Sequence, residues 1–259
     1  MNDLFNLTGK KAVVIGGGGG IGRAIATGLA NYGAQVVISS RNPETLRQAA
    51  AEIAQTTGKE VCCIPADASD EASIKALADA CMAKLGTVDI LVNSQGVNKK
   101  SPTVDMETET WDKMFSINVR GMMMACREFG KIMITKGCGK IINISSIRGI
   151  RAVIGGGGNT GYGATKGAVD MLTKGLAAEW AQYNIQVNAI GPVITDTPMM
   201  EKVFAQNPQL KPNLLRNIPM GRIGLTSDNI GPAVFLASAA SDFVTGQVIY
   251  PDGGSACVI

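Results

Sequence analysis

The sequence predicts an α/β fold in which a parallel sheet is covered by helices on both faces. Three observations support this prediction. Apolar, β-branched runs alternate with amphipathic helical segments through 259 residues, a dense glycine turn joins the first run to the first helix, and no linker or repeat interrupts the order. Strands separated by helices pair in parallel, and right-handed crossovers place the helices on both faces. We therefore expect a single doubly wound, Rossmann-type domain over residues 1–259, with a seven-stranded parallel sheet.

The seven expected strands are short apolar runs bounded by glycine, proline or polar residues. They are expected at residues 13–15, 35–40, 60–65, 88–93, 140–145, 185–190 and 247–250. Ligands of doubly wound sheets bind outside the carboxyl ends of the strands, where the strand order reverses. The residues that follow each strand are therefore the first place to look for chemistry.

The helices are expected where apolar residues recur at a spacing of three or four. Asn42 and Asp70 are suited to cap two of them, and Gly33, Gly58 and Gly86 to end three. The helical segments are residues 21–32, 42–57, 70–85, 110–136, 161–183 and 227–238. An irregular stretch with several prolines, residues 191–225, follows the sixth strand, and we expect it to cover the substrate.

The composition argues against several classes of protein. The net charge of +3 is small and the Lys and Arg residues are scattered, so we expect no nucleic-acid partner. No apolar run reaches the roughly 18–20 residues of a membrane span, and residues 1–6 lack the pattern of a secretory signal. The six cysteines show no metal-ligand spacing, which favours buried, reduced thiols. A cytoplasmic protein without a membrane partner is expected.

The chain contains no histidine. This absence removes Ser-His-Asp and Cys-His catalysis, histidine bases and histidine metal sites together. An enzyme with this sequence must move protons with Tyr, Lys, Asp, Glu, Ser or water, and we expect no metal.

The glycine turn after the first strand is suited to a bound pyrophosphate. Its glycines tolerate positive φ and let the backbone approach a ligand. The first amides of the following helix are unpaired and lie at the positive end of its dipole. A tight turn without any ligand is the alternative. If a nucleotide binds, the residues expected to hold its phosphates are Gly16, Gly18, Gly19, Gly20, Ile21 and Gly22.

The ends of the next strands predict which cofactor binds. The second strand ends without the acidic residue that would accept hydrogen bonds from a ribose 2′-OH, and Ser40 and Arg41 could contact a 2′-phosphate. We therefore expect NADP to be preferred, with NAD possible; the alternative is that Arg41 is a solvated loop charge. After the third strand, Asp67 could accept from the adenine amino group, with Ala68 beside it. The small polar residues expected to border a ribose are Asn93, Ser94 and Gln95.

Tyr162 and Lys166 lie four residues apart at the start of a predicted helix, so both side chains can reach one site. A free tyrosine has a pKa near 10, and a nearby ammonium together with an oxidised nicotinamide would lower it. The phenol could then exchange a proton with an alcohol or ketone oxygen. Ser146 ends the fifth strand nearby. Asn118, inside an otherwise apolar helix, needs partners and is either a structural hydrogen-bond hub or a water-holding group.

Taken in chain order, these motifs resemble those of the short-chain dehydrogenase/reductase family over nearly the whole length. They are Gly16-x-x-x-Gly20-Ile21-Gly22, Asp67, Asn93-Ser94-Gln95-Gly96, Asn118, Ser146, Tyr162-x-x-x-Lys166 and Pro192 to Thr197.

The resemblance implies a catalytic tetrad and a metal-free homotetramer. Tyr162 would be the acid/base, Ser146 would orient the substrate oxygen, and Asn118 would hold a water in a proton relay. Lys166 would bind the nicotinamide ribose and depress the tyrosine pKa. The residues implied to close on the nicotinamide carboxamide are Pro192, Val193, Thr195 and Thr197.

The sequence departs from the family pattern at four places. A threonine is usual where Ile15 stands, Asn-Ala is commoner than Ser94-Gln95, and a glycine is usual where Val193 follows Pro192. The interval from Ser146 to Tyr162 is also longer, because of Gly155–Gly158. These departures affect the cofactor grip and the substrate pocket, and none removes a tetrad residue.

Residues 2–5 and 231–238 are most similar to gluconate 5-dehydrogenase and related sugar-acid or polyol dehydrogenases. A small hydroxy or keto substrate is therefore expected, with Lys100 and Arg148 (and their neighbours Lys99 and Arg151) as candidates for binding a substrate anion. The alternative for each cation is a solvated surface charge. Two other functions stay open: a 3-oxoacyl-[acyl-carrier-protein] reductase and a non-catalytic dinucleotide-binding sensor.

Overall fold

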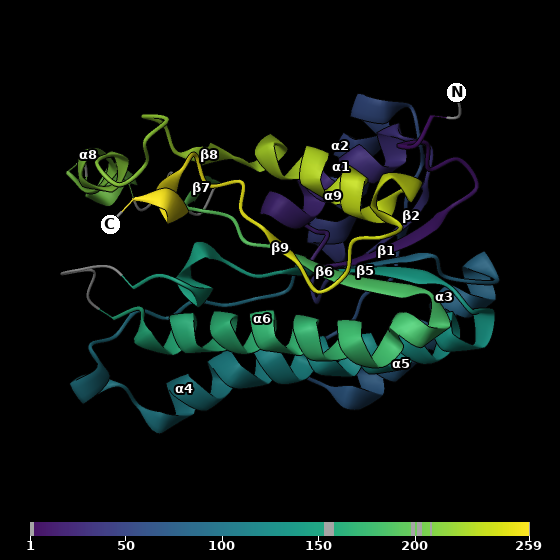
Figure 1. Cartoon of the computed structure of the whole chain (residues 1–259), viewed down its shortest axis with the longest axis horizontal. Coiled ribbons are helices and arrows are strands. Elements are labelled where there is room, and N and C mark those ends of the chain that lie inside the picture. The colour runs from purple at the N-terminus through teal and green to yellow at the C-terminus, as the bar shows by residue number, and fades with distance from the viewer. Residues whose placement is uncertain (1–2, 153–157, 198–199, 201–203, 208, 259) are drawn as a thin grey trace.

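The computed structural model describes residues 3–152, 158–197, 200, 204–207 and 209–258. Its centre is a seven-stranded parallel sheet with the strand order β3-β2-β1-β4-β5-β6-β9 (Figure 1). The strands are β1 Lys11–Ile15, β2 Gln35–Ser39, β3 Cys62–Cys63, β4 Ile90–Asn93, β5 Gly139–Ile144, β6 Ile185–Ile190 and β9 Val248–Ile249. The expected α/β fold with a seven-stranded parallel sheet is confirmed.

Helices cover both faces of this sheet (Figure 1). Residues of α1, α2 and α9 share one core cluster, and residues of α3, α5 and α6 share the other. The helices are α1 Gly20–Asn31, α2 Pro43–Thr57, α3 Glu71–Leu85, α4 Thr108–Phe115, α5 Gly121–Lys136, α6 Thr160–Trp180, α8 Leu210–Leu215 and α9 Ile230–Ala237. Among the helices of the described ranges, none combines the length and apolar character needed to span a membrane.

The strand order reverses at β1, which pairs with both β2 and β4. Alternate β1 residues face opposite sides, so Val13 and Ile15 join one core cluster while Ala12 and Val14 join the other. The glycine turn follows β1 directly and therefore lies at the position where doubly wound sheets bind ligands.

The helix predicted over residues 110–136 is not continuous. α4 ends at Phe115, a wide π turn spans Ser116–Arg120, and α5 begins at Gly121. Such a turn holds one more residue than an α-helical turn and so changes which side chains face inward. Here it directs Asn118 into the interior, where the side chain hydrogen-bonds to the loop after β4.

Other boundaries differ where strands lie at the edges of the sheet. β3 and β9 contain two residues each, although the apolar runs predict longer strands at 60–65 and 247–250. Each has a pairing partner on one side within the sheet, β2 for β3 and β6 for β9. The small β7 (Thr195–Asp196) and β8 (Gly224–Leu225) pair with each other in the stretch predicted to be irregular.

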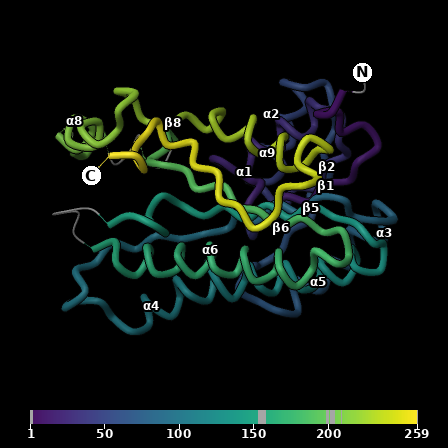
Figure 2. Tube along the Cα trace, in the orientation of Figure 1, coloured from purple at the N-terminus to yellow at the C-terminus, as the bar shows by residue number. Residues whose placement is uncertain are grey.

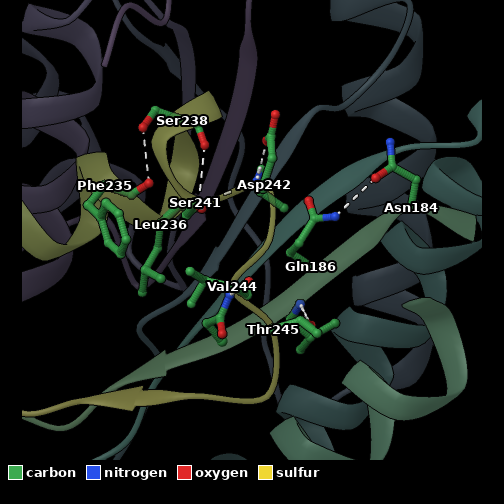
Figure 3. Close-up of polar contacts among 12 residues, drawn as sticks. Asn184, Gln186, Phe235, Leu236, Ser238, Ser241, Asp242, Val244 and Thr245 are labelled. Carbon is green, nitrogen blue, oxygen red and sulfur yellow. Dashed lines mark hydrogen bonds and ion pairs between the residues drawn. The ribbon is translucent and has the colours of Figure 1, made fainter. Parts of the chain in front are cut away.

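A polar cluster fixes the connection that delivers the last strand beside β6 (Figure 3). The Ser241 hydroxyl donates to the carbonyls of Leu236 and Ser238, at 3.1 Å each, and closes the turn after α9. Val187 in β6 donates its N–H to the Thr245 hydroxyl at 3.1 Å. From this cluster the yellow C-terminal stretch runs along the sheet towards the end where α6 begins (Figure 2).

Candidate active site

The glycine turn is packed so closely that several of its positions, Gly16 and Gly22 among them, exclude a side chain. A Cβ on Gly16, whose φ is +82°, would lie 2.6 Å from the backbone of Ser94. A Cβ on Gly22 would overlap the Gly16 carbonyl oxygen. The Gly16 N–H donates to the Ser39 carbonyl at 2.7 Å, which ties the turn to β2. Both residues are therefore needed as glycine for geometric reasons.

The N-terminus of α1 faces outward from this turn without a cap. Gly19 is the N-cap residue, has no side chain to hydrogen-bond, and accepts from the Arg23 N–H at 3.1 Å. No acidic residue lies in the first turn of α1. The backbone N–H groups before Arg23, including that of Gly22, therefore lie at the positive end of the helix dipole, and no acidic side chain neutralises it. This arrangement suits a phosphate.

Several buried polar groups beside the turn have no partner within the described residues, and two of them could meet a ligand. The Ser40 hydroxyl is one, and a Cβ on Gly18 would lie 2.9 Å from it. The Gln95 amide is the other: its nitrogen and oxygen are both unpartnered although the residue is only 8% exposed. A buried unsatisfied polar group costs about 1–3 kcal/mol. A dinucleotide beside the turn would supply hydrogen-bonding groups, so these residues fit one.

The remaining residues predicted to contact the adenosine half of the cofactor differ in exposure and in hydrogen bonding. Arg41 is exposed at the end of β2. The Asp67 carboxylate accepts from the Ser69 N–H and hydroxyl at 2.8 and 2.7 Å, and these bonds, with a smaller effect of the Arg41 charge, lower its pKa. Ala68 is buried beside it, and its carbonyl oxygen lies against Gly121.

The Asn93 side chain does not face this site. It is fully buried, and its Nδ2 donates to Asn143 Oδ1 at 2.9 Å and to the Cys126 sulfur at 3.3 Å. The predicted ribose contact can therefore involve only the backbone of Asn93. The physical reason is strand alternation, which turns Asn93 into the core under α5 and α6, whereas Ser94 points towards Gly22.

The structure brings Ser146, Tyr162 and Lys166 together at the carboxyl end of β5. Ser146 Oγ accepts from the Arg148 N–H at 3.2 Å and lies close enough to the Tyr162 phenol to act on its pKa. Lys166 Nζ is 5.5 Å from the centre of the Tyr162 ring. It donates to the Ile144 carbonyl at 2.7 Å, so the ammonium is held against β5.

Burial is the main influence on the pKa values in this cluster. Burial raises the pKa of Tyr162, and a hydrogen bond to Ser146 and the positive charge of Arg148 oppose the rise. Burial lowers the pKa of Lys166 to about 8, opposed by Asp170. Arg148 is therefore a second cation, beside Lys166, that lies near the Tyr162 phenol. The expected lowering of the Tyr162 pKa by Lys166 together with an oxidised nicotinamide stays a prediction.

Asn118 is a structural hub. Its Oδ1 accepts from the Val97 N–H at 2.8 Å, while Nδ2 donates to the Val97 carbonyl at 2.9 Å and to the Thr165 hydroxyl at 3.1 Å. Asn118 Oδ1 and Lys166 Nζ lie 3.5 and 3.7 Å from the position of a Cβ on Gly96. The tetrad is thus brought together. These bonds use both Nδ2 hydrogens, and Oδ1 accepts one bond.

The segment from Pro192 to Thr197 connects the tetrad with the glycine turn. The Pro192 carbonyl accepts from the Ile147 N–H at 3.1 Å, and Ser146 Oγ lies 3.5 Å away. At the other end, the Thr197 Cγ2 lies 3.6 Å from the position of a Cβ on Gly20. In between, the Thr195 hydroxyl donates to the Val193 carbonyl at 2.8 Å.

The candidate anion-binding residues are not all in one place. Arg148 is half-buried beside Tyr162, and no ion pair to it occurs in the part of the chain that is described. Arg151 instead donates to the Ser255 carbonyl in the C-terminal turn. Lys100 is exposed after β4. Most of the Gly155–Gly158 loop, residues 155–157, lies outside the described residues.

Asp170 and Tyr250 are not singled out by the sequence motifs, yet both lie beside the tetrad. Asp170 follows Lys166 by one helical turn, and its Oδ2 lies 3.5 Å from the Tyr250 hydroxyl. A carboxylate four residues after Lys166, on the same face of the helix, is the signal that could have identified Asp170. Tyr250 has no comparable local signal.

Comparison with known proteins gives matches along the whole chain. A family model described as Enoyl-(Acyl carrier protein) reductase matches residues 16–256. The gluconate 5-dehydrogenase of Gluconobacter oxydans is 36% identical over 252 residues, which cover 97% of this chain and 96% of that protein. A 3-oxoacyl-[acyl-carrier-protein] reductase of Chlamydia muridarum is 37% identical over 256 residues, covering 99% and 100%. The crystal structure of a gluconate 5-dehydrogenase from Burkholderia cenocepacia in complex with NADP and tartrate superposes with a TM-score of 0.92 at 36% identity, covering 99% of each chain.

Proposed function

The chain belongs to the short-chain dehydrogenase/reductase family and is an oxidoreductase acting on CH–OH groups with NAD(P); we propose that it interconverts a secondary alcohol and a ketone on a sugar acid or polyol, with NADP preferred. The observation that carries this proposal is the grouping of Ser146, Tyr162 and Lys166 beside the strand-order reversal. Turnover of a panel of sugar acids and polyols, followed by absorbance of the reduced nicotinamide, tests it. Cofactor binding without any turnover would favour the sensor alternative.

The dinucleotide would be held by the glycine turn, by Ser40 and Arg41 at the end of β2, and by Asp67 after β3. When bound, the nicotinamide accepts or donates the hydride. The chain's own residues then move the proton: the Tyr162 hydroxyl exchanges it with the substrate oxygen, and Ser146 Oγ hydrogen-bonds that oxygen. Lys166 keeps a positive charge in the site, and Asn118 holds the loop after β4 in place. The segment 191–225 would cover the substrate, since its first residues already join Ser146 to the glycine turn.

A sugar acid is favoured by the charge beside the tyrosine. Arg148 is half-buried and not ion-paired within the described residues, and a partly desolvated guanidinium is stabilised by a carboxylate ligand. Tartrate, bound in the Burkholderia structure, is itself a hydroxy acid. Arg148 lies in the turn after β5, and Lys100 is exposed in the loop after β4.

We expect Arg148→Ala and Lys100→Ala to raise KM for an acidic substrate by roughly tenfold or more, because a charge-assisted hydrogen bond contributes about 1.5–3 kcal/mol. KM for a neutral polyol should change by less than about threefold, because no charge-assisted hydrogen bond is lost. Steady-state kinetics on paired acidic and neutral substrates give the comparison. Lys75→Ala, on the exposed side of α3, is the matched control. Equal effects on both substrate types would show that neither cation binds an anion.

Gln95 offers a test of the cofactor site that needs no turnover. Gln95→Met keeps the side-chain volume and removes the buried unpartnered amide, so the cofactor-free protein should become more stable, by about 1 kcal/mol. NADPH should at the same time bind several-fold more weakly. Thermal unfolding and NADPH fluorescence titration measure the two effects.

The control for this experiment is Gln186→Met. Gln186 is equally buried at 8% exposure, but its Nε2 donates to Asn184 Oδ1 at 3.1 Å (Figure 3). That variant should lose stability and keep its NADPH affinity. Unchanged NADPH binding in Gln95→Met would show that the amide does not contact the cofactor.

A 3-oxoacyl-[acyl-carrier-protein] reductase is the second candidate, supported by the 37% identity to the Chlamydia enzyme. Both activities use the same tetrad, so the substrate decides between them. Faster reduction of a 3-oxoacyl thioester than of any keto sugar acid would favour this candidate.

We also propose a homotetramer, as the family resemblance implies. Large apolar side chains are exposed on the helices and the C-terminal region that such assemblies use, including Met123, Met171 and Phe243. Light scattering on purified protein gives the mass directly, and a monomer at micromolar concentration would contradict the proposal.

A further inference from the structure

We propose that Asp170 is a positioning residue of the active site: its buried carboxylate is the counterion of Lys166 and is fixed in place by Tyr250 of the C-terminal segment. The inference rests on the proposed function, because it concerns the charge that Lys166 presents to the cofactor. It adds to the tetrad two residues that lie outside it.

The first step is the position of Asp170 on α6. Tyr162, Lys166 and Asp170 follow one another at intervals of four residues, so they share one face of the helix. Asp170 is only 7% exposed. A Cβ on Gly149 would overlap Asp170 Oδ2, so the turn after β5 closes directly over the carboxylate. The carboxylate is therefore shut off from water on the side of the active site.

The second step is the contact from the C-terminal segment. Tyr250 follows β9, which pairs with β6 through Ile190 and Ile249. A Cβ on Gly191 would overlap the Cδ1–Cε1 edge of the Tyr250 ring, so the ring packs against the backbone just before Pro192. Its hydroxyl reaches Asp170 Oδ2 at 3.5 Å. Tyr250 also lines a cavity of about 340 Å³ together with Val193.

The third step is the charge balance around the carboxylate. Asp170 Oδ1 is buried and has no hydrogen-bond partner among the described residues. A buried carboxylate in this condition is unstable unless a cation compensates it. Burial raises the pKa of Asp170, and hydrogen bonds to Ser145 and Tyr250 oppose the rise. The charges of Lys166, one turn earlier on the same helix, and Lys174, one turn later, oppose it less strongly. Within the described residues neither lysine forms a direct ion pair with Asp170, so their charges act over a longer distance. Asp170 is in turn the acidic group whose charge raises the pKa of Lys166.

The groups that face this pair come from several elements. On α6 they are Tyr162 and Lys174, the turn after β5 contributes Arg148, and the C-terminal segment contributes Tyr250, whose own pKa is raised to about 12 by burial, Asp170 and Asp252. Burial lowers the pKa of Lys166 to about 8 even with Asp170 present. If Asp170 were uncharged, the pKa of Lys166 would fall further. The ammonium would then be lost at a lower pH.

The experiment measures NADPH affinity as a function of pH by fluorescence titration, from pH 6 to pH 10. In Asp170→Asn, the pH at which the affinity declines on the alkaline side should move down by roughly one unit, which corresponds to about 1.4 kcal/mol of lost interaction. Affinity at pH 6 should stay within a few fold of the unmodified protein, since Lys166 is charged there in both. Asp170→Glu should restore the original midpoint.

Three further variants separate charge from structure. Asp170→Ser should give the same shift and replaces Asp170→Asn if that variant does not fold. Tyr250→Phe keeps the carboxylate charge and removes its hydrogen bond, so the midpoint should stay in place while kcat falls. Asp79→Asn, an exposed change on α3, controls for net charge.

A midpoint that is the same in Asp170→Asn and the unmodified protein would overturn the proposal. So would an equal shift in Tyr250→Phe, because the hydrogen bond and not the charge would then matter. Since the titration uses cofactor alone, it is independent of the substrate. A failure to oxidise sugar acids would contradict the proposed function and leave this test intact.

Discussion

Replacement of Tyr162 by phenylalanine is expected to lower kcat by roughly 10²–10⁴-fold, the range typical of a lost general acid or base. Phe keeps the ring and removes only the hydroxyl. NADPH binding should therefore change little, since the ring still lies beside Lys166, whose Nζ is 5.5 Å from its centre. The chain contains no histidine, and the other phenol beside the tetrad, that of Tyr250, is directed at Asp170. Neither kind of group is therefore available to take over the proton.

Pre-steady-state and steady-state kinetics with the best substrate, together with NADPH titration, measure this effect. Tyr183→Phe, an exposed tyrosine after α6, should behave like the unmodified protein. Turnover of Tyr162→Phe within tenfold of normal would reject the phenol as the acid/base.

The raised pKa of Tyr162 also predicts opposite pH profiles for the two directions of the reaction. Burial keeps the phenol protonated at neutral pH, the form that donates a proton to a ketone. Ketone reduction should therefore be sustained at neutral pH and decline at alkaline pH. Alcohol oxidation needs the phenolate and should rise with pH over the same range.

Reversal of charge at Arg41 is the second large expected effect. Arg41→Asp should lower the ratio of kcat/KM with NADP to that with NAD by roughly a hundredfold or more. One charge-assisted contact to the 2′-phosphate contributes about 1.5–3 kcal/mol, and each 1.4 kcal/mol is a factor of ten. The new carboxylate would repel the phosphate and accept hydrogen bonds from a ribose 2′-OH. The unpartnered Ser40 hydroxyl next to it should keep part of the phosphate affinity.

Initial rates with both cofactors at varied concentration give the ratio. Lys59→Asp, an exposed charge reversal after α2, is the control and should leave the ratio unchanged. An unchanged ratio in Arg41→Asp would mean that its guanidinium does not meet the 2′-phosphate.

The parts of the site that could be predicted depend on residues that are close together in the sequence. The glycine turn is predictable because steric exclusion at Gly16 and Gly22 requires glycine at fixed positions between a strand and a helix. Tyr162 and Lys166 are predictable because a spacing of four places both on one helical face. Seven apolar runs separated by helical segments were enough to predict the sheet.

The parts that could not be predicted depend on contacts between distant segments. The π turn that carries Asn118 is stabilised by hydrogen bonds to Val97, and the apolar periodicity continues through it. Asn93 looks like a cofactor contact by position, but its side chain bonds to Asn143, fifty residues later. The contact of Tyr250 with Asp170 spans eighty residues. Burial, which no local pattern gives, also raises the pKa of Tyr162 in the protein without cofactor.

The contact between Tyr250 and Asp170 has a consequence for the order in which the protein matures during synthesis. Chains emerge from the ribosome N-terminal end first, so the glycine turn after β1 is made before β9 and before Tyr250, which follows β9. A nascent chain can therefore build the surface for the nucleotide before the carboxylate beside Lys166 receives its hydrogen bond. Asp170 obtains this bond only after β9 has been synthesised.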